Sequence, residues 1–367
     1  MLRIQLIKFV DRWLGAALVH LLPKPPLMSL PVGELHSILL IRPGGIGDAV
    51  HLAPAIQLLR QSFPELAIDL LAERRNAGIF ALCPGLRKVY LYDHPWQLLQ
   101  AVRGRYDVVI DTEQWHRLSA VIARLVKSPI KVGYATNERA RLFTHPLSYS
   151  HDDYEIVSFL RLLEPLSLSR MVLSEDPWLL VPEVARQSVA SLFPAHDDRP
   201  LVVIFPGASI VERRWGAERF RSLAQWCFRQ GLRVVVVGGA GDRNDGEQIV
   251  FGLEALNLTG KTSLAETAAV LENAAVVISG DSGILHIAVG LGRPTVSLFG
   301  PGIASKWAPK GPRHVVLNKK SICSPCTRFG YTPSCPRGVR CMRDISVSEV
   351  TLGITKLLPL FASNGNP

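Results

Sequence analysis

The chain alternates short aliphatic runs with longer helical patterns, and it does so twice. Such runs, bounded by turn residues, are typical of buried parallel strands. In the first half, strands are predicted at residues 37–41, 67–72, 88–92 and 107–110, with a helix at 49–62. In the second half, strands are predicted at 201–205, 233–237, 275–279, 295–299 and 315–317, with helices at 217–230, 264–273 and 282–290. The sequence therefore predicts two doubly wound α/β domains, with ligands at the carboxyl ends of the strands and in a cleft between the domains.

The length of 367 residues is sufficient for two domains that each bury a core. Six cysteines are too few for a disulfide scaffold, which favours a reducing compartment. The net charge of +10 is uneven, because residues 1–150 hold 18 Lys and Arg against 11 Asp and Glu. Nucleic acid, acidic lipid and phosphorylated small molecules all remain open as partners of this basic first half.

The first thirty residues are expected to form an amphipathic leader and a Pro-rich linker. Leu2–Leu22 is apolar but is interrupted by charges, and it has neither the length for a bilayer span nor a signal cleavage site. On a helical wheel Gln5, Lys8, Asp11, Arg12 and Gly15 share one arc, and Leu6, Phe9, Val10, Trp13, Leu14 and Ala17 occupy the rest. This pattern suits a helix in the membrane interface, a helix packed on its own domain, or a dimer contact.

A glycine-rich turn follows the first predicted strand. The sequence there is Arg42-Pro-Gly-Gly-Ile-Gly-Asp48, and the turn contains Gly44, Gly45 and Gly47. Val50 stands where a dinucleotide fingerprint needs its third glycine, so NAD binding is disfavoured. Asp48 is predicted either to cap the following helix or to act as a general base at the mouth of the cleft. His51, one turn further on, is either structural or orients an acceptor.

The second half repeats this arrangement of polar loops after strands. Ser209 and the pair Arg213 and Arg214 follow one strand, and their hydroxyl and guanidinium groups suit the oxygens of a diphosphate. Gly238-Gly-Ala-Gly-Asp242 follows the next strand, and Gly280-Asp-Ser-Gly-Ile-Leu-His286 follows another. Asp281 is a candidate helix cap, while Ser282, Gly283 and the helix start offer donors to phosphate.

These segments resemble glycosyltransferase family 9, the ADP-heptose:lipopolysaccharide heptosyltransferases and their relatives. The matching stretches are IRPGGIGDAVHLAPAI, FPGASIVERRWGAERF, VVVVGGAGD, NLTGKTSLAETAAVL and GDSGILHIAVGLGRPTVSLFGP. The resemblance implies a GT-B architecture with two Rossmann-like domains facing a cleft. It also implies an inverting, metal-independent transferase that needs no cofactor and uses an ADP-sugar as its donor.

The resemblance also implies a role for each candidate residue. Asp48 corresponds to the base that deprotonates the acceptor hydroxyl, and Gly44, Gly45, Gly47 and His51 belong to the acceptor-side loop. Ser209, Arg213, Asp242, Thr262, Asp281, Ser282, Gly283 and His286 correspond to donor-binding positions. The implied acceptor is an anionic glycolipid such as the lipopolysaccharide core, at the cytoplasmic face of the inner membrane.

The expected domains are a leader at 1–30, an acceptor-side domain at 31–195, a donor domain at 196–345 and a final helix within 346–367 that can cross back to the first domain. Cys323, Cys326, Cys335 and Cys341 lie close in sequence, and four thiolates at such spacing either hold a structural Zn²⁺ or remain reduced. Two functions of other classes stay open beside the transferase. They are a noncatalytic nucleotide- or phosphate-binding protein and a zinc-dependent nucleic-acid binder, and two complete α/β domains argue against the latter, so no nucleic-acid partner is expected.

Overall fold

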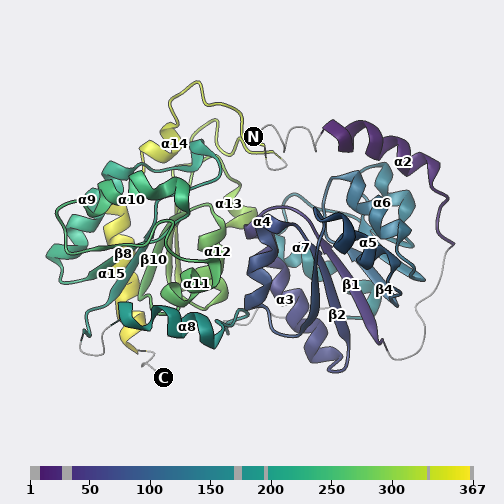
Figure 1. Cartoon of the computed structure of the whole chain (residues 1–367). Helices are drawn as coiled ribbons and strands as arrows, with labels where there is room; N and C mark the ends of the chain where they lie inside the picture. The colour runs from purple at the N-terminus through teal and green to yellow at the C-terminus, as the bar shows by residue number, and fades with distance from the viewer. Residues whose placement is uncertain (1–8, 27–34, 169–175, 194–196, 329–330, 364–367) are drawn as a thin grey trace. The chain divides into compact units, whose positions relative to one another are not determined.

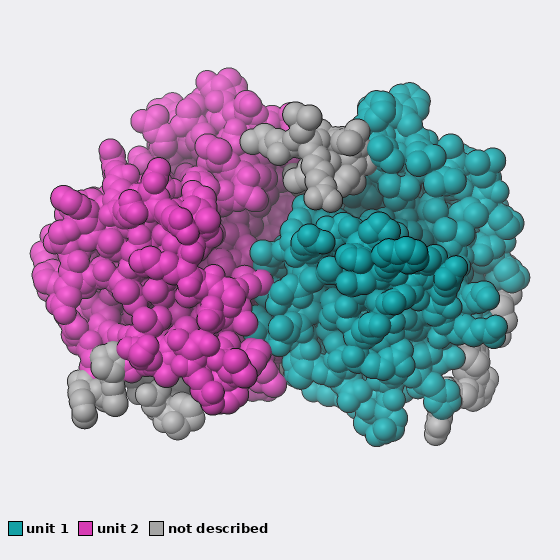
Figure 2. Space-filling view, in the orientation of Figure 1, with its two compact units in different colours: residues 1–173 teal, residues 174–367 magenta. Residues whose placement is uncertain are grey.

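The computed structural model describes residues 9–26, 35–168, 176–193, 197–328 and 331–363. The chain divides into two compact units, residues 1–173 and 174–367 (Figures 1 and 2). The expected boundary near residue 195 lies later than this division, because the segment before it packs on the second unit. There α8 (Glu183–Val189) contacts α11 (Leu264–Glu272), and the amides of Trp178 and Leu179 donate to the carbonyl of Gly290.

Unit 1 is built on a six-stranded parallel sheet in the order β3-β2-β1-β4-β5-β6 (Figure 1). The strands are β1 (Ser37–Arg42), β2 (Ala67–Ala72), β3 (Leu86–Leu91), β4 (Val108–Asp111), β5 (Ile130–Tyr134) and β6 (His145–Leu147). β1, β2, β4 and β5 are almost entirely buried, as expected for parallel strands that are covered on both faces. This strand order is that of a Rossmann domain.

The helices of unit 1 connect these strands. They are α3 (Ile46–Ser62), α4 (Arg74–Ala77), η2 (Gly78–Leu82), α5 (Pro95–Arg103), α6 (Arg117–Leu125), η3 (Glu138–Leu142), α7 (Glu155–Arg161) and η4 (Glu164–Leu166). Residues from α5, α6 and the sheet share one hydrophobic core cluster, which includes Ala101, Val109, Ala120 and Phe143. α3 packs against α7.

Unit 2 repeats the same design. Its parallel sheet has the order β12-β11-β10-β7-β8-β9, which is the same winding counted from the other edge. The strands are β7 (Leu201–Phe205), β8 (Arg233–Val236), β9 (Leu256–Asn257), β10 (Val276–Gly280), β11 (Thr295–Phe299) and β12 (His314–Asn318). The predicted pair of doubly wound α/β domains is thereby confirmed.

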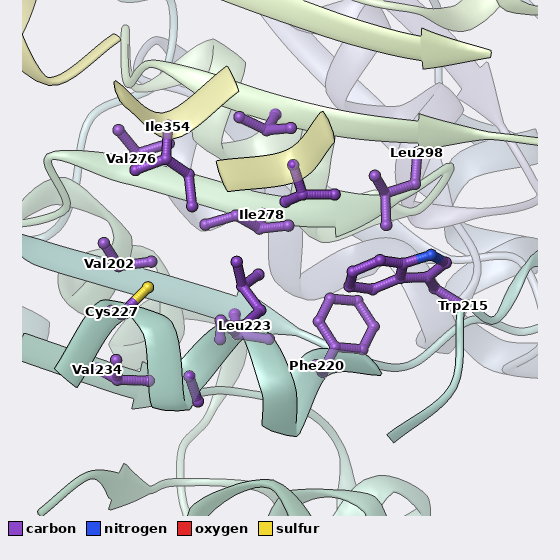
Figure 3. Close-up of a cluster of buried hydrophobic side chains, with 14 of the residues drawn as sticks. Val202, Trp215, Phe220, Leu223, Cys227, Val234, Val276, Ile278, Leu298 and Ile354 are labelled. Atoms are coloured by element: carbon purple, nitrogen blue, oxygen red, sulfur yellow. The ribbon is translucent and has the colours of Figure 1, made fainter. Parts of the chain in front are cut away.

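Helices cover the second sheet, and aromatic side chains fill the layer between them. The helical elements besides α8 and α11 are η5 (Ala190–Leu192), η6 (Val211–Arg213), α9 (Ala217–Arg229), η7 (Ala240–Asp242), α10 (Arg243–Val250), α12 (Gly283–Gly290), α13 (Ala304–Trp307), α14 (Arg340–Arg343) and α15 (Val347–Ser363). Figure 3 shows Trp215 edge-on to Phe220, at 4.9 Å between ring centroids, beside Ile278 and Leu298. The indole of Trp215 also donates to the carbonyl of Ile345, which ties the chain before α15 to this core.

The final helix packs on the second sheet. Val350, Ile354 and Leu357 of α15 are buried in the same core as α9 and β10, and α15 contacts α9, β11 and β12 (Figure 3). Gly353 allows this close approach, since a Cβ there would lie 3.2 Å from the Val296 side chain. Over its described residues α15 therefore packs on the sheet of unit 2, and that the final helix crosses back to the first domain stays a prediction.

Three strands were missed in the sequence. β5 contains Lys131 and Gly133, β6 contains Pro146, and β9 has only two residues, so none of them presents an uninterrupted apolar run. Lys131 is nevertheless buried, because its amine donates to the carbonyls of Val126 and Ser128 beyond the end of α6. A charged residue such as Lys131 inside a parallel strand interrupts the apolar pattern from which strands are predicted.

The leader is helical over the part that is described and packs on unit 1. η1 (Asp11–Gly15), a turn of π-helix, continues into α2 (Ala16–Leu21), and both contact α6. Asp11 is buried, and its Oδ1 accepts from the amides of Arg117 and Leu118, both at 2.8 Å. Asp11 of the leader therefore faces the protein, where its carboxylate caps the start of α6. Among the described residues, no helix is both long and apolar enough to cross a bilayer.

We expect Asp11→Ala to lower the free energy of unfolding by about 1 kcal/mol, because two amides of α6 lose their acceptor. Burial alone would raise the pKa of Asp11, but its bonds to His116, Leu118 and Arg117 outweigh burial and lower it. The stabilisation is therefore present above the pKa of the unfolded carboxyl and is lost as pH falls through the folded pKa. Chemical denaturation at neutral and acidic pH measures both effects.

Asp11→Asn is the matched control for this prediction. Its amide oxygen remains an acceptor, so we expect it to keep most of the stability at neutral pH but to remove the dependence on acid. Equal stability of Asp11→Ala and the wild-type protein would contradict the capping role.

Candidate functional site

Most of the expected site residues follow strands at one place in each sheet. In both units the winding reverses between the first and fourth strands, β1 and β4 in unit 1 and β7 and β10 in unit 2. The loops that leave such neighbouring strands diverge to opposite sides, which opens a crevice where α/β proteins bind ligands. Asp48 follows β1, Arg213 follows β7 and Asp281 follows β10.

The glycine-rich turn after β1 places Asp48 in the first turn of α3. Gly44 has φ of +116°, a conformation that favours glycine, and Gly45 is the N-cap of a helix that begins at Ile46. The prediction that Asp48 is itself the cap is therefore wrong: the helix starts two residues before it. Asp48 is half-buried, and the N–H groups of the helix start favour its negative charge.

The buried side chain of Arg42 holds this turn through hydrogen bonds. Arg42 donates through Nε to the carbonyl of Pro43, through Nη1 to the carbonyl of Thr112 and through Nη2 to Glu113 at 3.1 Å. A second buried arginine, Arg139, binds the carbonyl of Glu113 and the carboxylate of Asp111. The two arginines connect the ends of β1 and β4 with η3.

Arg42 and Glu113 hold each other in the ionised form. Burial alone would raise the pKa of Glu113, but the charges of Arg42, His116 and Arg139 outweigh it and hold the pKa below its ordinary value. Burial likewise lowers the pKa of Arg42, and Glu113, Asp48 and Glu155 together raise it above its ordinary value. Arg42 therefore remains a cation within the field of Asp48.

A cluster of polar and aromatic residues beside Asp48 escaped the sequence analysis. Glu155 at the start of α7 is buried and accepts from Tyr149 Oη at 3.0 Å and from Gln114. The charge of Asp48 contributes to the raised pKa of Tyr149, after burial and Glu155, and the ring of Tyr154 lies 5.9 Å from that of His51. His51 is buried. The signal available in the sequence was the polar, aromatic run Tyr149–Tyr154.

In unit 2, an ion pair lies across the switch point of the sheet. Arg213 Nη1 lies 2.9 Å from Asp281 Oδ2, and His286 Nε2 lies 4.0 Å from Asp281 Oδ1. Burial raises the pKa of Asp281 against the opposing charge of Arg213, and burial together with that charge lowers the pKa of His286 to about 3. The imidazole is therefore neutral at neutral pH. Ser209 lies exposed on the loop before Arg213.

The helix after β10 is capped by Ser282 rather than by Asp281. Ser282 Oγ accepts from the amide of Leu285 at 3.2 Å, and Gly283 is the first residue of α12. The prediction that Asp281 caps this helix is wrong, because its carboxylate is directed to Arg213. Gly302 lies against that carboxylate, since a Cβ there would be 2.3 Å from Asp281 Oδ2. The loop after β11 thus closes over Asp281.

Asp242 and Thr262 have structural partners in the same unit. Asp242 is buried, accepts from the amide of Gly239 at 3.0 Å and pairs with Arg214 at 3.2 Å. Thr262 shares a hydrogen bond of 2.9 Å with Thr267 of α11. Asp242 therefore joins the loops after β7 and β8.

The four clustered cysteines are not disulfide-bonded. Cys323 is exposed, Cys326 and Cys335 are half-buried and Cys341 is buried. Burial, followed by the neighbouring Cys323 and Cys335, raises the pKa of Cys326, which favours neutral thiols. In the described part of the chain, no three His, Cys, Asp or Glu side chains are placed to hold a metal ion. The structural Zn²⁺ that the cysteine spacing allows stays a prediction.

Two Rossmann-like domains in one chain, each with charged and glycine-rich loops at its switch point, define the GT-B fold class that the sequence predicted. Residues 95–332 match glycosyltransferase family 9 (heptosyltransferase). The chain belongs to this family and is a glycosyltransferase, as its motifs indicated.

Several heptosyltransferases are similar to this chain over most of their length. Lipooligosaccharide heptosyltransferase 2 of Haemophilus influenzae is 27% identical over 292 residues, which cover 72% of this chain and 83% of that protein. Lipopolysaccharide heptosyltransferase 3 of Escherichia coli K12 is also 27% identical over 292 residues, covering 72% and 82%. The structure of E. coli ADP-heptose lipopolysaccharide heptosyltransferase II matches with a TM-score of 0.72 at 21% identity, covering 88% of this chain and 99% of that one.

We expect Arg42→Met to lower the free energy of unfolding by about 3–5 kcal/mol, because the buried carboxylate of Glu113 loses its cation. Urea denaturation measures the change. Arg199→Met is the control: Arg199 pairs with Asp197 at the surface of unit 2, and its loss is expected to leave the denaturation midpoint unchanged. Equal effects of the two substitutions would contradict a supporting role for Arg42.

Proposed function

We propose that the protein transfers heptose from ADP-heptose to the lipopolysaccharide core or a related envelope glycolipid, with inversion at the anomeric carbon and without a metal ion. The observation that carries the proposal is the carboxylate of Asp48 on the first turn of α3, half-buried in the field of Arg42. A carboxylate at the start of this helix is the kind of group that a one-step inverting displacement uses as its base. The relatives named above are heptosyltransferases, and one of them is an ADP-heptose lipopolysaccharide heptosyltransferase.

The proposed step exchanges one bond at the anomeric carbon for another. The acceptor hydroxyl oxygen attacks the anomeric carbon of the donor from the face opposite the diphosphate. As the new carbon–oxygen bond forms, the bond from the anomeric carbon to the β-phosphate oxygen breaks, and its electron pair leaves with ADP. Asp48 takes the hydroxyl proton, so that the glycoside formed is neutral at the new linkage.

The negative charge on the departing ADP is proposed to be stabilised by unit 2. Arg213 Nη1 is paired with Asp281, but its buried Nε has no hydrogen-bond partner within the described residues. A guanidinium that is held by one ion pair can donate its remaining N–H groups to a phosphate oxygen while it stays oriented. The exposed Ser209 hydroxyl and the start of α12 at Ser282 and Gly283 supply further donors. Neutral His286 adds no charge and can donate or accept one hydrogen bond.

These fixed donors support the proposal that no metal and no cofactor is required, since they supply the positive potential that a metal gives other transferases. Activity in the presence of a chelator is the direct measurement. The acceptor is proposed to be an anionic glycolipid at the cytoplasmic face of the inner membrane, because the relatives modify lipopolysaccharide or lipooligosaccharide and the first half of this chain is basic.

We expect Asp48→Asn to lower kcat by about 10²- to 10⁴-fold, because the hydroxyl loses its base while the size of the side chain is kept. ADP release from ADP-heptose with a heptose-deficient lipopolysaccharide acceptor measures it. Glu65→Gln, an exposed carboxylate of the same unit, is the control and should retain full activity. A protein that binds ADP but transfers no sugar, with or without Asp48, would support the noncatalytic alternative instead.

We expect Arg213→Met to weaken ADP binding by about 10- to 100-fold, because a charge-assisted hydrogen bond to phosphate is lost. Arg213→Lys keeps the charge and should recover part of the affinity. Calorimetric titration with ADP and with adenosine separates the binding of the diphosphate from the binding of the nucleoside, since adenosine carries no phosphate. An equal loss of affinity for both ligands would place Arg213 away from the diphosphate.

A further inference from the structure

The leader helix has an outward side that is apolar, although its inward side carries the buried carboxylate. We call Phe9, Trp13, Ala17 and Leu21 the outer ridge. These residues are spaced four apart, as residues on one side of a helix are. The side chains of Phe9, Trp13 and Leu21 are 62%, 63% and 78% exposed. A helix that covers a water-soluble domain normally presents polar residues on this side, so the outer ridge calls for a covering partner.

The opposite side determines which way the outer ridge faces. Asp11, Gly15 and Val19 are buried, and a Cβ on Gly15 would lie 3.0 Å from Arg117 Cβ of α6. The carboxylate of Asp11 accepts hydrogen bonds from two backbone amides of α6, and Val19 lies in the core of unit 1. The helix therefore cannot roll to bury the outer ridge on its own unit without breaking these contacts.

The polar groups around the outer ridge are cationic. Between residues 9 and 26 the Lys and Arg residues are Arg12 and Lys24, and the single acid, Asp11, is buried. Arg12 is exposed, with its guanidinium 5.7 Å from the centre of the Trp13 ring, and Lys24 is exposed after the helix. From the neighbouring elements, Arg141 donates to the carbonyl of His20 and Arg124 to that of Pro23. Apolar side chains bordered by exposed cations complement an anionic lipid surface.

We propose that the outer ridge inserts into the interface of an anionic lipid bilayer and holds unit 1 on it. The helix lies parallel to the membrane surface. Its described residues 9–21 are about 20 Å long, which is too short to span the hydrocarbon layer. Trp13 lies at the headgroup level, and Phe9 and Leu21 bury their side chains on either side of it. The proposal deepens the proposed function in that a glycolipid acceptor is presented by such a surface, but lipid binding itself requires no transferase activity.

The test is flotation of the full chain with vesicles that contain no saccharide acceptor. We expect the protein to float with phosphatidylcholine vesicles that contain phosphatidylglycerol and to float poorly with phosphatidylcholine alone. The triple variant Phe9→Ser, Trp13→Ser, Leu21→Ser should reduce partitioning by about tenfold or more, because the apolar insertion is lost. Arg12→Gln and Lys24→Gln should each reduce it about fivefold at low salt.

The control variant is Val184→Ser with Phe251→Ser in unit 2, where both side chains are 75% exposed. It should float as the wild-type protein does, and Trp13→Phe should retain most of the binding. The thermal midpoint of the triple variant and its transfer of sugar to a delipidated acceptor should both be unchanged. Loss of lipid binding with retained transfer would thus leave the proposed function intact.

Two results would overturn the proposal. One is equal flotation of the triple variant and the wild-type protein. The other is a wild-type protein that does not bind anionic vesicles and is a dimer by light scattering, while the triple variant is a monomer. In that case a second copy of the chain covers the outer ridge.

Discussion

An arginine held by an acid across the switch point organises each of the two units. In unit 1, Arg42 at the end of β1 reaches Glu113 beyond β4, and in unit 2, Arg213 after β7 reaches Asp281 after β10. A parallel sheet leaves a crevice at this point, and a guanidinium fills it while bridging two loops. The two arginines differ in how many of their guanidinium nitrogens have hydrogen-bond partners in the protein. All three guanidinium nitrogens of Arg42 donate to protein groups, whereas the buried Nε of Arg213 has no hydrogen-bond partner within the described residues.

The strands were predictable because most of them are buried on both faces and therefore consist of uninterrupted aliphatic residues. Nine of the observed strands coincide with predicted ones to within two residues. The strands that were not predicted, β5, β6 and β9, lack such an uninterrupted aliphatic run. Lys131 in β5 is buried with its amine bound to backbone carbonyls, and nothing in the local sequence distinguishes it from a lysine at the surface.

The site was predictable where a loop carries its own chemistry and unpredictable where the partner is distant. The glycines before Asp48 and the polar residues after β7 and β10 stand next to strands that the sequence already indicated. Glu113 lies 71 residues from Arg42, and Glu155 lies 41 from Gln114, so neither pair leaves a local pattern. Helix starts were misassigned for a related reason. Gly45 caps α3 without a side chain, and Asp281, a good cap by type, is drawn to Arg213 instead.

The docking of Asp11 on α6 has a consequence for where this protein begins as a folding unit. The stretch that matches the family starts at residue 95, and the first strand starts at Ser37, so a boundary drawn from either would discard the leader. Yet the carboxylate that closes the first turn of α6 comes from 106 residues upstream. A protein shortened to Ser37 would leave the amides of Arg117 and Leu118 without the Asp11 acceptor and would expose the part of the core that Val19 covers. Engineering of the amino terminus therefore has to preserve the leader as an integral part of the first domain.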